Sequence, residues 1–270
     1  MRSFELHPLS NAFELTNLGE QSLNDFIANE NNDLQIFLKK NSTWRDNDTL
    51  TKQFWKKKFS IENKKLAFVK QNPTLYYAFS LFRRDIIHSH INIDSLLKTY
   101  HTVFPDSFKL SSESTHILKV LNGRNLRKDV QAPNFTTKDT EGKAVSPKCY
   151  KGSYVLLTFW STTCKPCIEE LPAILKINSQ YSSKKLSIIS VSTDTNRNVF
   201  LKAVKKYQMK WTNVCGDIDD IIVSYGVKSI PQIYLIDSEG KIVYSREEER
   251  DFTPELAVLN KILEEKIAKQ

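Results

Sequence analysis

Two patterns of hydrophobic residues divide the chain. Up to about residue 123, apolar residues recur at spacings of three and four, as in Leu34, Phe37 and Leu38. This is the spacing that places side chains on one face of a helix. Beyond about residue 130, short continuous apolar runs, typical of buried strands, alternate with helical segments. The pattern predicts an all-helical part followed by an α/β part.

The helical part is predicted to occupy residues 21–128 and to carry no catalytic chemistry. Residues 1–20 are weakly patterned and stay unassigned: they fit a tail, a tag remnant or the last strand of a preceding domain. An aromatic cluster that includes Trp55, Phe79 and Phe82 is expected to form the helical core, and one face of it could serve as a docking surface.

Three local signals mark predicted helix ends in this part. Asn72 and Pro73 read as the start of a helix, and Asp94 as the N-cap of another. Asn122 and Gly123 read as a left-handed C-terminal cap that ends the last helix. A charged linker, residues 124–130, follows.

Residues 129–270 are predicted to form a central mixed sheet with helices on both faces. An edge strand is expected to open at Ala132, and the turn at residues 139–143 places Gly142 where a positive φ is needed. Thr253 and Pro254 are expected to cap the final helix. The other predicted elements are strands at residues 154–160 and 186–192, helices at 199–207 and 218–225, and a hairpin of residues 232–236 and 241–244.

A Cys-x-x-Cys motif follows the first buried strand, where a helix is predicted to begin. Cys164 would lie at the helix N-terminus, where unpaired N–H groups and the positive end of the helix dipole stabilise a thiolate. The motif indicates a redox dithiol. The alternatives are a structural disulfide or half of a zinc site, and zinc is disfavoured because Cys149 and Cys215 stand alone, without histidines nearby. A Cys149–Cys215 disulfide stays open.

Composition narrows the function classes. The 270 residues include 39 Lys and Arg against 31 Asp and Glu, a net charge of +8. The lysines are scattered and not clustered with aromatic residues, so nucleic-acid binding is not expected. No apolar run of 18 or more residues is present, and the N-terminus lacks a signal-peptide pattern. The chain is therefore expected to be either cytosolic or trimmed of a signal.

The α/β part resembles a known family through a series of short motifs. These are AP-NF, DTEGK, LLTFW, CKPC, EELP, KSIPQ and IDSEGKI, in this order, over about residues 130–268. They resemble the bacterial TlpA/ResA-type thiol-disulfide oxidoreductases of the thioredoxin superfamily. The resemblance implies a thioredoxin-like fold and disulfide exchange with other proteins.

The resemblance also implies roles for three residues. Cys164 would be the attacking thiolate, with its pKa lowered from the usual value of about 8.5. Cys167 would resolve the mixed disulfide. Glu170, one turn further on, would take or give the proton of the resolving thiol, while Glu169 would be its solvated neighbour.

The substrate-binding residues are also implied by the resemblance. Ile230 and Pro231 match the family's cis-proline loop, whose backbone would pair with an extended substrate segment. Trp160 matches the family, whereas Thr163 stands where the family often has tryptophan. Lys165 and Pro166, between the cysteines, complete this predicted substrate surface.

The resulting hypothesis is a reductase of specific protein disulfides in the periplasm or cell envelope, recharged by a membrane electron donor. No cofactor and no metal are expected, and cytochrome c maturation is one process that the resemblance suggests. The helical part would dock a partner or mediate dimerisation. Two alternatives stay open: a peroxiredoxin-like thiol peroxidase, although Leu157 replaces the proline of the peroxidase pattern while Ser161 matches it, and a metal chaperone or docking module.

Overall fold

The computed structural model describes residues 8–181 and 184–268 of the chain. They fold as two compact units, Met1–Leu121 and Asn122–Gln270. The domain boundary predicted from the sequence lies a few residues later, at residue 128. Each unit is described by itself.

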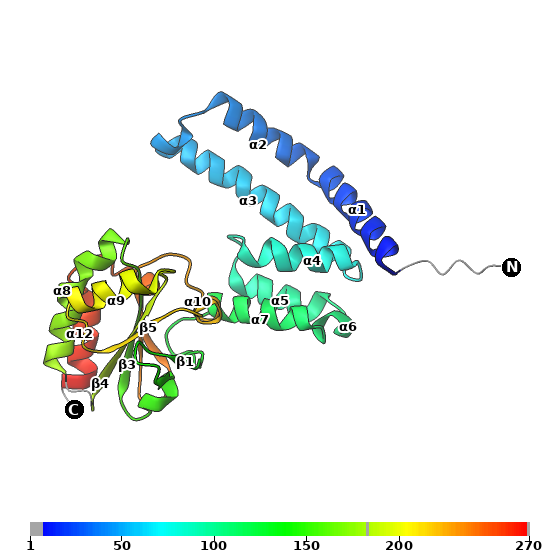
Figure 1. Ribbon diagram of the computed structural model, residues 1–270. Helices are drawn as coiled ribbons and strands as arrows, with labels where there is room; N and C mark the ends of the chain where they lie inside the picture. Colours follow the sequence, from blue (N-terminus) through cyan, green and yellow to red (C-terminus); the bar gives the residue numbers. More distant parts are fainter. Residues whose placement is uncertain (1–7, 182–183, 269–270) are drawn as a thin grey trace. The chain divides into compact units, whose positions relative to one another are not determined.

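The first unit is built of helices. Helices α1, α2 and α3 come first, and α4, α5, α6 and α7 follow (Figure 1). Its elements are α1 (Pro8–Phe26), α2 (Ala28–Lys40), η1 (Trp44–Asp46), α3 (Asp48–Gln71), α4 (Tyr76–Arg84), η2 (Ile86–His88), α5 (Ile93–Val103), α6 (Asp106–Lys109) and α7 (Ser112–Arg124).

The helix ends differ from the local signals in the sequence. Helix α1 begins at Pro8, so most of the segment left unassigned is helical, and its interpretation as the last strand of a preceding domain is wrong from Pro8 onward. Asn72 ends α3 rather than starting a helix, because its N–H bonds back to carbonyls of that helix. Asn92, not Asp94, caps α5.

The predicted C-terminal cap at Asn122 and Gly123 is also wrong, since α7 continues to Arg124. Gly123 lies within the helix and has another reason to be glycine. A side chain there would collide with the backbone carbonyl of Val223, which belongs to the same unit. The glycine therefore allows close backbone packing and does not end the helix.

Aromatic residues fill the helical core, as predicted. Phe79 and Phe82 are fully buried, and both rings contact Phe104 edge-on, with centroids 5.1 and 5.2 Å away. Trp55 and Tyr76, which were assigned to the same cluster, are about half exposed. The core and the exposed aromatic residues are thus different side chains.

The second unit contains a five-stranded mixed sheet in the order β5-β4-β3-β6-β7. Central strand β3 pairs with β4 in parallel and with β6 antiparallel. The two buried strands have the bounds predicted from their apolar runs. The strands are β3 (Tyr154–Trp160), β4 (Leu186–Ser192), β5 (Thr212–Cys215), β6 (Gln232–Ile236) and β7 (Ile242–Ser245), and a separate hairpin is formed by β1 (Thr137–Lys138) and β2 (Ala144–Val145).

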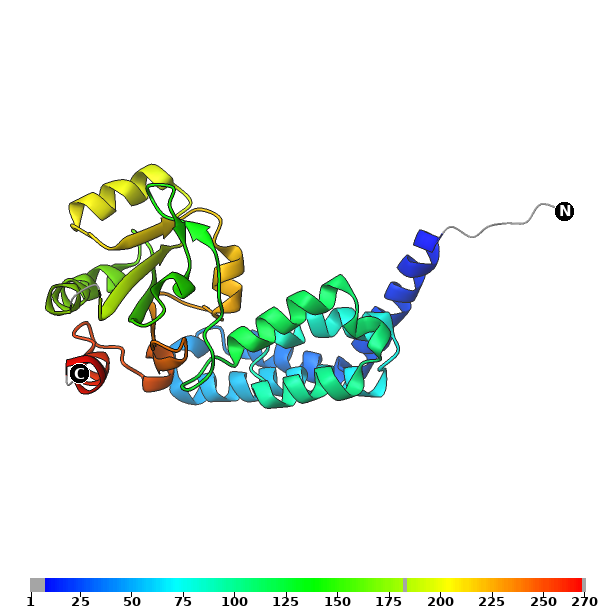
Figure 2. The same ribbon diagram turned by 90° about the horizontal axis from the view of Figure 1, so that it is seen from below.

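Helices cover both faces of this sheet, as expected from the alternating pattern. Leu156 and Ile188 face α8 and α12, whereas neighbouring residues Leu157 and Ile189 face α10. Figures 1 and 2 show α8, α9 and α12 together on one side and α10 on the other. The remaining elements are η3 (Pro147–Tyr150), α8 (Lys165–Gln180), α9 (Arg197–Lys206), α10 (Asp219–Ser224), α11 (Arg246–Glu249), α12 (Ala257–Leu263) and η4 (Glu264–Ala268).

Two sequence predictions for this unit need correction, and one is confirmed. The edge strand expected at Ala132 is absent, because the first strand begins only at Thr137. The final helix starts at Ala257, after Leu256 in left-handed conformation, and not at Thr253. Gly142 does have the positive φ predicted for its turn, 85°.

Within the described ranges 8–181 and 184–268, no helix is long and apolar enough to cross a membrane.

Candidate redox site

The site begins where β3 gives way to α8. Cys164 is the N-cap of α8, and it forms a disulfide with Cys167, with 5.2 Å between their Cα atoms. The N–H of Cys167 points at Sγ of Cys164, 3.2 Å away. Cys164 is half-buried, whereas Cys167 is only 3% exposed. Of the two sulfurs, that of Cys164 is therefore the one a partner protein can reach.

Asp194 fixes the loop that precedes the motif. Its carboxylate accepts hydrogen bonds from the N–H and the hydroxyl of Thr162, at 2.9 and 2.7 Å, and from the hydroxyl of Ser192 at 2.6 Å. The loop between β3 and α8 is thus tied to the end of β4. Nothing in the sequence singled out Asp194, because a carboxylate after a strand is usually solvated.

The predicted substrate-binding residues differ in their exposure to solvent. Thr163, Lys165 and Pro166 are exposed around Cys164. Trp160 is buried and packs in the core with Cys167, so the structure offers its side chain to the interior and not to a partner.

A cis peptide bond joins Ile230 and Pro231, as the resemblance implied. Pro231 lines the same small cavity as Cys167, and Ile230 packs against the hydrophobic cluster that Cys164 also contacts. The loop before β6 therefore lies against the disulfide.

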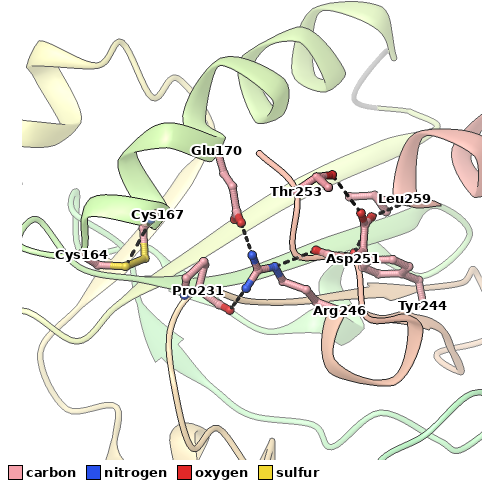
Figure 3. Close-up of polar contacts among 9 residues, drawn as sticks. All are labelled: Cys164, Cys167, Glu170, Pro231, Tyr244, Arg246, Asp251, Thr253 and Leu259. Carbon is pink, nitrogen blue, oxygen red and sulfur yellow. Dashed lines mark hydrogen bonds and ion pairs between the residues drawn. A yellow bond between two sulfur atoms is a disulfide. The ribbon is translucent and has the colours of Figure 1, made fainter. Parts of the chain in front are cut away.

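Glu170 is buried one turn after Cys167. It is 2% exposed, and its Oε1 is paired with Nη2 of Arg246 (Figure 3). Burial raises the pKa of Glu170 from 4.5 to about 7; the positive charge of Arg246 opposes this shift, and the negative charge of Asp251 adds to it. The carboxyl therefore titrates near neutral pH, where a proton donor or acceptor for a thiol is most effective.

Glu170 and Cys167 share a cavity of about 10 Å³. Three polar atoms of its lining residues are buried without a hydrogen-bond partner in the described part of the chain: Oε2 of Glu170 and the indole Nε1 atoms of Trp160 and Trp211. A cavity of this size has room for about one water molecule. The second oxygen of Glu170 is thus not engaged by the protein.

Arg246 and Asp251 complete the site, and the sequence did not point to either. The Asp251 carboxylate accepts the hydroxyl of Tyr244 and the N–H of Leu259, both at 3.0 Å, which ties the segment after β7 to α12. Arg246 opens the run REEER, and a charged run is usually a solvated face. Only the fold reveals that its first member points inward.

The other two cysteines are free thiols. Cys149 is exposed, and Cys215 is half-buried with its Sγ 3.2 Å from the carbonyl of Asp194. The disulfide between them that the sequence left open is not formed. Among the residues whose structure is described, no group of three or more His, Cys, Asp or Glu side chains is placed to hold a metal ion.

Residues 129–245 match the AhpC/TSA family. Curated relatives include the thiol-disulfide oxidoreductase ResA of Bacillus thuringiensis subsp. konkukian, 37% identical over 113 residues, and ResA of Bacillus subtilis, 31% identical over 112 residues. These alignments cover 42% of this chain and 65% and 63% of the two relatives, so the chain spans less than two thirds of their length.

Solved structures give similar matches. The thioredoxin domain of a thiol-disulfide oxidoreductase from Bacteroides vulgatus is 31% identical, with a TM-score of 0.45 over 51% of this chain and 98% of that one. A thiol:disulfide interchange protein from Bacteroides sp. is 32% identical, with a TM-score of 0.47 over 53% and 91%.

Proposed function

We propose that this chain reduces disulfides of other proteins, since residues 129–245 match the AhpC/TSA family and thiol-disulfide oxidoreductases are among the similar proteins. The observation that carries the proposal is the Cys164–Cys167 disulfide, with Cys164 half-exposed at the start of α8 beside the cis-proline loop. A thiol pair that forms a disulfide within one helix turn can release a partner after attacking it.

The reaction begins with the reduced dithiol. The Cys164 thiolate attacks one sulfur of the substrate disulfide, forms a mixed disulfide and expels the first substrate thiolate. Cys167 then loses its proton and attacks Sγ of Cys164, which expels the second substrate thiolate. The substrate gains two electrons, and the protein ends with the disulfide seen in the structure.

Glu170 acts in the second step. Cys167 is buried, so its proton needs an acceptor within the protein. Glu170 lies one turn away, lines the same cavity and titrates at about pH 7. We assign it the role of accepting the proton of Cys167 when the mixed disulfide is resolved, and of returning it when the disulfide is reduced.

The exposed residues around Cys164 supply the partner surface. Thr163, Lys165 and Pro166 lie beside the attacking sulfur, and the backbone of Ile230 offers hydrogen bonds to an extended substrate segment. The substrates are therefore proteins with accessible disulfides. A reductase of this kind needs an electron donor, and the resemblance to the TlpA/ResA type favours a membrane donor and a location in the periplasm or cell envelope.

The test is a trapping experiment with Cys167→Ser. This variant should accumulate mixed disulfides between Cys164 and protein substrates, because the resolving thiol is gone. Pro231→Ala in the same background should trap fewer partners, since it alters the loop that holds them. The matched control is Cys149→Ser combined with Cys167→Ser. This double variant should trap as many partners as Cys167→Ser alone.

A peroxidase would behave differently. It needs only a peroxide-reactive thiolate, so Cys167→Ser would still form sulfenic acid at Cys164 rapidly. Fast consumption of hydrogen peroxide by the wild type, with no trapped protein, would overturn the reductase proposal.

A further inference from the structure

Arg246 makes three contacts that join separate parts of the redox site. Its Nη2 pairs with Oε1 of Glu170, its Nη1 donates to the carbonyl of Pro231 at 2.7 Å, and its Nε donates to the carbonyl of Asp251 at 3.1 Å. Figure 3 shows the guanidinium between Glu170 and Pro231. The side chain is buried, with the residue 7% exposed. One planar group therefore touches both the predicted proton acceptor and the cis-proline loop.

The contact with Glu170 is one-sided. Arg246 holds Oε1, whereas Oε2 has no hydrogen-bond partner among the described residues, and the side chain lines the cavity that it shares with Cys167. The rigid fork of a guanidinium fixes the direction of a carboxylate more tightly than an ammonium group does. Clamping one oxygen thus leaves the other available for the proton of Cys167.

The contact with Pro231 is on the inner side of the loop. Because the Pro231 carbonyl is taken up by Arg246 in the interior, the loop has a fixed orientation in which the backbone of the preceding Ile230 can face a partner. A charged hydrogen bond of this kind, out of water, is stronger than one between neutral groups.

We propose that Arg246 is a positioning residue that couples the substrate-binding loop to the proton acceptor of the redox site. It orients Glu170 toward Cys167 and, through the same guanidinium, holds Pro231 in place for the substrate. This inference rests on the proposed reductase function.

The groups facing Glu170 set the sign of the expected pH effect. Arg246 on α11 stabilises the carboxylate, whereas Asp251, in the segment after α11, disfavours it, and Tyr244 on β7 bonds to Asp251. On its own helix, Cys167 is the nearby thiol. Removing the positive charge of Arg246 should therefore raise the pKa of Glu170 further and move proton transfer to higher pH.

Two substitutions separate the functions of Arg246. Arg246→Met removes both the charge and the hydrogen bonds, and it keeps an unbranched side chain. Arg246→Lys keeps the charge near Glu170 but cannot bond Glu170 and Pro231 with one planar group. Arg250→Met is the matched control, because Arg250 is an exposed arginine of the same segment.

The measurements use two disulfide probes on the reduced full chain. 5,5′-Dithiobis(2-nitrobenzoate) has no peptide backbone and reports attack and resolution as two successive releases of nitrothiobenzoate. Insulin is a peptide substrate that needs the loop. In Arg246→Met, the pH midpoint of the resolution step should rise by about one unit, and KM for insulin should rise several-fold. The rate of the first release should stay within about twofold of wild type.

Arg246→Lys should keep the wild-type midpoint and still raise KM for insulin, and Arg250→Met should change neither. A midpoint and a KM that both stay at wild-type values in Arg246→Met would overturn the proposal. If Arg246→Met does not fold, the test rests on Arg246→Lys. A KM for insulin equal to that of the wild type in Arg246→Lys would overturn the coupling to Pro231.

Failure of the reductase function is distinguishable from failure of this inference. In that case the wild type itself would not reduce insulin. The titration of the Glu170 carboxyl, followed by NMR in the wild type and in Arg246→Met, would still test the positioning role, and equal midpoints in the two proteins would overturn it.

Discussion

Among the side chains that the structure describes, each unit contains one buried glutamate, and the hydrogen bonds of the two carboxylates differ. Glu62 of α3 is 8% exposed and uses both oxygens: Oε2 accepts the N–H of His90 at 2.9 Å, and Oε1 lies 3.0 Å from Nδ1 of the same residue. Glu170 of α8 is 2% exposed, and only its Oε1 is engaged. Both oxygens of the first carboxylate have partners, whereas the second has one oxygen without a partner and lines the same cavity as Cys167.

This contrast supports the role proposed for Glu170. Burying a carboxylate costs free energy unless its oxygens are hydrogen-bonded. A buried carboxylate with one unbonded oxygen therefore destabilises the fold and calls for an explanation. For Glu170, the cost appears as a pKa raised to about 7.

The largest expected effect is on the resolution step. Glu170→Gln removes the proposed proton acceptor of Cys167, so the second release from 5,5′-dithiobis(2-nitrobenzoate) should slow by about a hundredfold at pH 7, while the first release is unchanged. Stopped-flow absorbance measures both phases. Glu62→Gln and Glu169→Gln are the controls, and an equal slowing by Glu169→Gln would mean that only general electrostatics is involved.

The next effect is on stability and its pH dependence. Because the folded-state pKa of Glu170 is raised from 4.5 to about 7, the folded state binds this proton more tightly than the unfolded state does. Its contribution is therefore fully present below about pH 4.5 and is lost as pH rises to about 7, a decrease of about 3 kcal/mol in the free energy of unfolding.

Glu170→Gln should abolish this decrease, since the amide cannot ionise. At pH 8 the variant's second unit should be more stable than that of the wild type, and at pH 5 the two should be nearly equal. Hydrogen exchange in increasing urea, read separately for peptides of each unit, measures the difference. A variant that is less stable than wild type at pH 8 would contradict the assigned direction of the pKa shift.

Glu62→Gln should act with the opposite sign. The amide can accept one hydrogen bond but presents N–H groups where Glu62 accepted the other, so the helical unit should lose about 1–3 kcal/mol. The same exchange experiment measures it, and the second unit should not change. If Glu62→Gln left the helical unit as stable as before, the distinction between the two carboxylates would fail.

Local patterns in the sequence predicted the framework of the redox unit well. The apolar runs of β3 and β4 set their bounds, because strands buried on both faces contain few polar residues. Cys164 and Cys167 were placed at the helix start by the motif itself. Helix starts marked by Asn72 or Thr253 were wrong: the residues that precede α4 and α12 are Leu75 and Leu256, and neither helix has a side-chain cap.

The polar network around Glu170 could not be predicted. Arg246 lies 76 residues from Glu170 along the chain, and it opens a charged run that resembles solvated surface. It follows β7, the last strand of the sheet order, and Asp251 is hydrogen-bonded to α12 through the N–H of Leu259. Such contacts depend on the whole topology and leave no signal in local spacing.

The smallest expected effect concerns the exposed ion pair next to the site. Lys165 and Glu169 lie four residues apart on α8, with 3.7 Å between Nζ and Oε1, and their side chains are 87% and 49% exposed. Water screens such a pair, so it should contribute less than about 0.5 kcal/mol to stability. The lysine also precedes the glutamate, which is the less favourable order on a helix.

The same screening limits what Lys165 can do for the Cys164 thiolate. In the reduced protein, iodoacetamide at pH 7 should modify Cys164 before the buried Cys167, and Lys165→Met should slow modification of Cys164 by less than about twofold. Mass spectrometry of the alkylated peptides measures both rates. A slowing of tenfold or more would show that the lysine, and not the helix N-terminus, activates the thiol, whereas preferential labelling of Cys167 would reverse the assignment of the two cysteines. The expected result would mean that buried groups and the helix backbone determine the reactivity of Cys164. A charge that faces water shifts the pKa of a nearby thiol much less than a charge held out of water.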